Sequence, residues 1–116
     1  MNMKLSQIIS LLKCENLTNG RHDDVEVTKT IASDLMSDVL AFAEPGALLV
    51  TGLTNSQSVR TADIADATGI IYIRGKRPDE QTLNLAKEMG IPLFATTKGM
   101  FEVCAILDSI GLKGIC

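Results

Sequence analysis

The sequence predicts an α/β fold in which a mainly parallel sheet is layered between helices. Three short, wholly apolar runs carry this prediction, because strands of a parallel sheet are covered on both faces and are apolar at every position. These runs are residues 47–50, 70–73 and 93–95. A segment with helical periodicity follows each run, and this alternation indicates β-α-β units with right-handed crossovers.

The first 45 residues predict a helix, a strand and a second helix that lead into the same sheet. Residues 4–13 place their leucines and isoleucines on one helical stripe. Residues 24–31 alternate between apolar and polar, which predicts a strand with one solvent-facing side. Lys29 falls on the apolar side, and we interpret this break as the end of the strand. Ser33 is a favourable N-cap for the helix that then runs to Phe42.

The remaining segments predict three more helices, residues 56–67, 79–89 and 98–110. Gly90 and Gly111 follow the last two of these helices, where glycine is the favoured residue at the C-terminal end. The 116 residues contain no internal repeat and no linker-like tract. We therefore expect one domain, residues 1–116.

The composition excludes several classes of partner and cofactor. Eleven Lys and Arg stand against 14 Asp and Glu, for a net charge of −3, so no broad basic field is available for nucleic acid or an anionic membrane. No apolar run approaches the ~18 residues of a membrane span, and the N-terminus lacks a secretory signal. Three cysteines without a C-x-x-C pair argue against a metal site or a disulfide framework. The chain is expected to be cytoplasmic and to need no cofactor.

The candidate functional residues follow the apolar runs. In open α/β sheets, ligands bind beyond the carboxyl ends of the parallel strands. The hydroxyls, the amide, the cations and a helix N-terminus found there suit a phosphate or a carboxylate. Lys76 is expected to point inward because it adjoins Gly75. The same residues could also serve only as helix caps and turns. The candidates are Thr51, Gly52, Thr54, Asn55, Ser56, Arg60, Arg74, Gly75, Lys76 and Arg77, with residues 96–99 as a third loop.

No motif for catalysis is recognisable. The stretch from Gly69 to Lys76 is not a phosphate-binding P-loop, because five residues rather than four separate its glycines and Arg77 occupies the position of the required hydroxyl. His22, the only histidine, is far in sequence from every candidate loop, which argues against a Ser-His-Asp triad. We expect the chain not to be an enzyme.

Residues 46–111 resemble the DRTGG domain, which occurs beside CBS domains and is akin to the N-terminal domain of HPr kinase/phosphorylase. The resemblance rests on Leu48-Leu49-Val50-Thr51-Gly52, on residues 70–78, and above all on the A-x-E-x-G-I-P-x-x-x-T spacing of residues 86–96. It implies an α/β fold, a non-catalytic regulatory role and frequent dimerisation. Gly75 is the one residue that matches the letters of the family's name.

Two functions remain open from the sequence. The first is a regulatory or protein-interaction domain that forms a homodimer, because the apolar stripe of Ile8, Ile9, Leu11 and Leu12 must be covered by something. Under this hypothesis a second protein is a further possible partner. The alternative is a sensor that binds a phosphorylated or nucleotide metabolite at the candidate loops.

Overall fold

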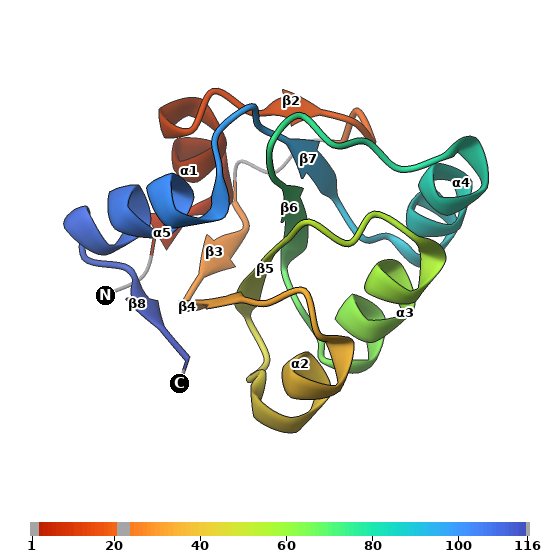
Figure 1. Cartoon of the computed structure of the whole chain (residues 1–116), viewed down its shortest axis with the longest axis horizontal. Coiled ribbons are helices and arrows are strands. Elements are labelled where there is room, and N and C mark those ends of the chain that lie inside the picture. Colours follow the sequence, from red (N-terminus) through yellow and green to blue (C-terminus); the bar gives the residue numbers. More distant parts are fainter. Residues whose placement is uncertain (1–2, 21–23, 116) are drawn as a thin grey trace.

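The computed structural model describes residues 3–20 and 24–115. Its centre is a six-stranded sheet in the order β2-β7-β6-β5-β4-β8 (Figure 1). All neighbouring strands are parallel except β2, which pairs antiparallel with β7. The three predicted apolar strands are parallel neighbours, as expected. The strands are β2 (Glu15–Asn16), β4 (Lys29–Ala32), β5 (Ala47–Thr51), β6 (Gly69–Tyr72), β7 (Leu93–Ala95) and β8 (Lys113–Gly114).

The strand predicted over residues 24–31 is in fact two strands. β3 (Glu26–Val27) pairs antiparallel with β1 (Met3–Lys4) in a separate two-stranded sheet, whereas β4 begins at Lys29 and belongs to the main sheet. The prediction of one solvent-facing side was also wrong for β4, since Thr30 and Ile31 are both buried. The reason is that β4 lies between β5 and β8 and is packed on both faces.

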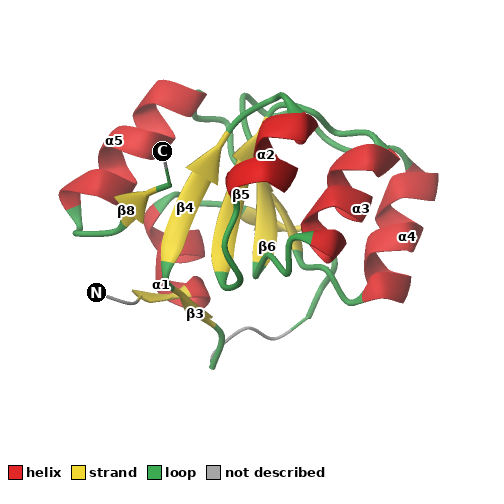
Figure 2. Ribbon diagram, turned by 90° about the horizontal axis from the view of Figure 1, so that it is seen from below, coloured by secondary structure: helices red, strands yellow, loops and turns green. Residues whose placement is uncertain are grey.

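Five helices complete a three-layer sandwich. Helices α2 (Met36–Phe42), α3 (Ser56–Ile64) and α4 (Glu80–Met89) cover one face of the sheet, and α1 (Leu5–Leu11) and α5 (Met100–Ser109) cover the other (Figures 1 and 2). The side chains of the central strands alternate between two apolar cores. In β5, Leu49 packs on the α2–α4 side and Leu48 on the α1–α5 side. The predicted architecture is therefore confirmed.

Of the helix-end residues predicted from the sequence, one was wrong and two are confirmed. Ser33 is not the N-cap of α2: its hydroxyl accepts a hydrogen bond from the Leu35 amide at 3.0 Å, and the helix begins only at Met36. That short turn uses the Ser33 hydroxyl before the first helical residue. Gly90 and Gly111 have φ angles of 73° and 95° at the ends of α4 and α5, as expected for the left-handed residue that ends a helix.

The N-terminal apolar stripe is covered within the chain. Leu5, Ile8 and Leu12 are fully buried in the core that α1 shares with α5, whereas Leu11 is 43% exposed. Ile8 and Leu12 of the predicted stripe are thus covered by α5 and the sheet and do not require a second copy, whereas Ile9 is partly buried and Leu11 stays exposed.

Candidate functional site

The carboxyl ends of β4, β5, β6 and β7 lie at one edge of the sheet, because these strands are parallel. The loops that follow them are joined by backbone hydrogen bonds. The Ser33 amide donates to Val50 O at 3.1 Å, and the Arg74 and Gly75 amides donate to Lys98 O and Thr96 O at 2.8 Å each. The third predicted loop thus lies directly beside the second.

Asp34 lies at the centre of this edge and was not among the predicted residues. Its Oδ1 accepts from the Gly52 amide at 2.6 Å and from the Thr51 hydroxyl at 3.1 Å. Thr51 and Gly52 therefore hold a carboxylate of the chain itself. The rule of strand ends would have found Asp34, which follows Ala32, the last residue of β4, by two positions.

Arg74 approaches the same point from β6. A Cβ added to Gly52 would lie 3.5 Å from Arg74 Nη2, 3.4 Å from Asp34 Oδ1 and 3.5 Å from Asp34 Oδ2. Arg74 and Gly75 both adopt left-handed conformations, with φ of 56° and 70°. Such a conformation is strained for an arginine, and strained residues concentrate at functional sites. Within residues 3–20 and 24–115, the Arg74 guanidinium has no ion-pair partner.

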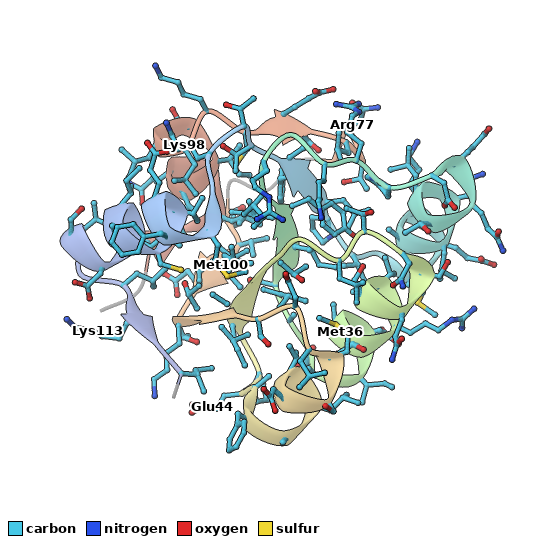
Figure 3. All side chains as sticks on the ribbon, in the orientation of Figure 1. Met36, Glu44, Arg77, Lys98, Met100 and Lys113 are labelled. Atoms are coloured by element: carbon cyan, nitrogen blue, oxygen red, sulfur yellow. The ribbon has the colours of Figure 1, made fainter. Side chains whose placement is uncertain are left out.

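The other two cations of this loop point in different directions. Lys76 Nζ donates to Gly52 O at 3.2 Å, so its side chain crosses to the loop after β5. This is the direction predicted for it. Arg77 instead forms a bidentate pair with Glu15 of β2, at 2.5 and 3.0 Å, on the outer side of the loop (Figure 3). The hydrogen bond to Arg77 lowers the pKa of Glu15, and the pair leaves Arg77 committed to a surface contact.

The residues at the start of α3 serve the helices. Asn55 is the N-cap, and its Oδ1 accepts from the Gln57 amide at 3.1 Å. The Ser56 hydroxyl bonds to the Thr82 hydroxyl of α4 at 3.2 Å. With Arg60, Ser56 lines a surface groove of about 530 Å³ beside α4. Thr54 lies partly exposed in the loop between Gly52 and the helix. Ser56 and Arg60 therefore face α4, whereas Gly52, Arg74 and Lys76 come together.

Comparison with known proteins identifies the family. The profile of the DRTGG domain matches residues 7–110. The chain belongs to the DRTGG domain family. Among curated proteins, none matches this chain.

A solved structure shares the fold of this DRTGG domain. It contains the CBS and DRTGG domains of the regulatory region of Clostridium perfringens pyrophosphatase, complexed with the activator diadenosine tetraphosphate. The TM-score is 0.72 at 17% identity, over 90% of this chain and 45% of that one. This DRTGG domain thus spans less than half of the chain that it matches, and the likeness concerns the fold.

The strand-end edge of this DRTGG domain combines both signs of charge around a glycine. Arg74 supplies a planar donor suited to phosphate or carboxylate, and Lys76 a second cation whose present partner is an uncharged carbonyl. Asp34 Oδ2 accepts no hydrogen bond from the residues that the structure describes. In the same residues, no group of three or more His, Cys, Asp and Glu is arranged to hold a metal ion. The edge can thus offer donors to an anion and one acceptor to a hydroxyl.

Proposed function

We propose that this chain is a single regulatory domain that responds to a small phosphorylated or nucleotide ligand at the carboxyl edge of its sheet. The observation that carries the proposal is the exposed Arg74 guanidinium, without an ion-pair partner in the described residues and 3.5 Å from the vacant Cβ position of Gly52. Two further facts support it: the family of the chain, and the nucleotide activator bound to the pyrophosphatase regulatory region.

An anion that binds at this edge would displace few existing contacts of Arg74 and Lys76. Arg74 gives up no salt bridge with a described residue when it binds a phosphate, and Lys76 gives up a single bond to Gly52 O. A hydrogen bond to a charged group contributes roughly 1.5–3 kcal/mol. Two such bonds together contribute roughly 3–6 kcal/mol, which corresponds to a dissociation constant between several millimolar and tens of micromolar and suits a domain that senses the concentration of a metabolite.

The role that we propose is non-catalytic. Burial raises the pKa of Cys14 to about 12 and also raises that of Cys104, so neither thiol is disposed to act as a thiolate nucleophile. Burial likewise raises the pKa of Tyr72 to about 12, which keeps its hydroxyl protonated. The helices in the described residues are too short, or not apolar enough, to cross a bilayer.

The test compares two arginines of one loop by calorimetry. The parent protein is titrated with pyrophosphate and with diadenosine tetraphosphate, and then the variants Arg74→Gln and Arg77→Gln. Arg74→Gln should weaken binding by about tenfold or more, because it removes a hydrogen bond to a charged group. Arg77→Gln is the matched control, since Arg77 already pairs with Glu15. Absence of binding to the parent at millimolar ligand, or equal losses in both variants, would contradict the proposal.

A homodimer is the second part of the proposal, and the surface of α2 favours it. Leu35, Leu40, Phe42 and, on α3, Ile64 are 49–73% exposed. Helices α2 and α3 lie side by side on the same face of the sheet (Figure 2). Light scattering at tens of micromolar protein should give twice the chain mass, and Phe42→Ser should reduce it. Phe101→Ser is the control, because Phe101 is exposed on α5, on the other face. A parent that scatters as a monomer would exclude the dimer and leave the ligand site unaffected.

A further inference from the structure

An acid and a base meet at Gly52 without pairing with each other. Asp34 and Arg74 both reach within 3.5 Å of the position that a Cβ of Gly52 would occupy, yet they form no salt bridge. Asp34 is held in its position by the Gly52 amide and the Thr51 hydroxyl. The Arg74 backbone is held by Lys98 O. The chain thus keeps two opposite charges within 3.5 Å of a position that carries no side chain.

The Asp34 carboxylate weakens the binding of an anion that offers it no hydrogen-bond donor. A pyrophosphate on Arg74 would lie near the Asp34 carboxylate, and the like charges would repel each other. A ligand that both accepts from Arg74 and donates to Asp34 Oδ2 would satisfy both groups. A hydroxyl that donates to a carboxylate forms a charge-assisted bond, among the stronger hydrogen bonds in proteins. A phosphate ester with neighbouring hydroxyls, such as ribose phosphate, carries both groups in one molecule.

We infer that the ligand of this edge is a ribose phosphate, free or within a nucleotide, with its hydroxyls on Asp34 Oδ2 and its phosphate on Arg74. This inference rests on the proposed ligand-binding function and adds which group of the ligand binds Asp34 and which binds Arg74. Gly52 is part of the site, because a Cβ at this buried position would contact both Asp34 and Arg74 at 3.4–3.5 Å and restrict how the two side chains reach a ligand. The φ of Gly52 is outside the left-handed region, so the backbone itself does not demand glycine there.

The first experiment changes only the ligand and leaves the protein intact. The parent is titrated calorimetrically with AMP, ribose 5-phosphate, 2′,3′-dideoxy-AMP and pyrophosphate. AMP and ribose 5-phosphate should bind roughly 10- to 100-fold more tightly than the probes without ribose hydroxyls. Equal binding of these two assigns recognition to the sugar phosphate, and tighter AMP adds the base. If dideoxy-AMP and pyrophosphate bind as tightly as AMP, the inference fails while the proposed anion site stands. If no probe binds, both fail.

The second experiment uses two variants with matched controls. Asp34→Asn should weaken AMP and strengthen pyrophosphate, because it removes both the carboxylate acceptor and the repulsion. A merely structural role would weaken both probes together, and that result would overturn the inference. Gly52→Ala should fold, since its methyl would meet Asp34 and Arg74 at ordinary contact distances, but should lose AMP binding. The controls are Asp38→Asn on α2 and Gly114→Ala on β8, which should bind AMP as the parent does.

Discussion

A buried pair of hydroxyls, one on α3 and one on β6, allows a test of which hydroxyl donates the hydrogen bond between them. Ser58 Oγ lies 2.8 Å from the Tyr72 hydroxyl and also donates to Asn55 O at 2.7 Å. A serine hydroxyl has one proton, and a carbonyl only accepts. The Ser58 proton is therefore committed to Asn55, and Tyr72 must be the donor in the bond between the two side chains.

This direction makes the two single deletions unequal. Ser58→Ala leaves the buried Tyr72 hydroxyl without an acceptor, which costs roughly 1–3 kcal/mol, and it also removes the bond to Asn55. Tyr72→Phe removes the donor and leaves Ser58 bonded to Asn55, so the net loss is about 1 kcal/mol. In the double variant the unpaired hydroxyl is gone, so the double variant should cost no more than Ser58→Ala alone.

Urea unfolding followed by circular dichroism measures these differences, because a domain of this size is expected to unfold in two states. Each kcal/mol should lower the midpoint of thermal unfolding by about 4 °C. The assignment of the donor is refuted if Tyr72→Phe is as costly as Ser58→Ala, or if the two costs add in the double variant.

Three further predictions concern pH, the end of a helix and the N-terminal core. The free energy of unfolding should fall by about 2–3 kcal/mol as the pH rises from 10 to 12. The unfolded chain releases the Tyr72 proton near pH 10, whereas the folded chain keeps it until about pH 12. Urea unfolding measured across this pH range should show no such fall in the Tyr72→Phe variant. Gly90→Ala should cost about 1 kcal/mol in urea unfolding, because Gly90 has a φ of 73°. Gly114→Ala should cost almost nothing, because the φ of Gly114 is outside the left-handed region and the added Cβ would meet only Thr30 O, at 3.8 Å. Ile8→Ala should cost about 2–5 kcal/mol in urea unfolding, because Ile8 is fully buried. Light scattering should give this variant the same mass as the parent. A lower mass would instead place α1 in an interface between copies of the chain.

The central strands were predictable because burial on both faces leaves a direct record in the sequence. β5, β6 and β7 contain apolar residues that pack alternately into the two cores. The edge strands β2 and β8 leave no such record. Each has two residues, Glu15–Asn16 and Lys113–Gly114, and is defined only by pairing with a distant strand. Composition and periodicity contain no information about such a pairing.

The candidate site was predictable as a region but not in its details. The rule of strand ends identified the loops that carry Gly52, Arg74 and Lys76. Which side chains turn inward depends on partners far along the chain, such as Glu15, which is 62 residues before Arg77. Asp34 was missed because the charge of Lys29 interrupts the apolar pattern, so that the strand that precedes Asp34 was not recognised as one of the parallel strands of the sheet. In the structure, Lys29 is half-exposed and pairs with Glu44 at 3.5 Å, so its charge is compatible with the strand.

The loops at the carboxyl edge are bonded in series. Asp34 holds Gly52, Gly52 holds Lys76, and the neighbouring Arg74 is bonded to Lys98. These loops lead into α2, α3, α4 and α5 in turn. We therefore expect the amide protons along this edge to exchange with solvent as one cooperative unit, slower or faster together, as foldons do. A ligand bound at the edge would slow amide exchange in the N-terminal turns of four helices at once. Because these helices lie on both faces of the sheet, the change would be measurable on both sides of the sandwich.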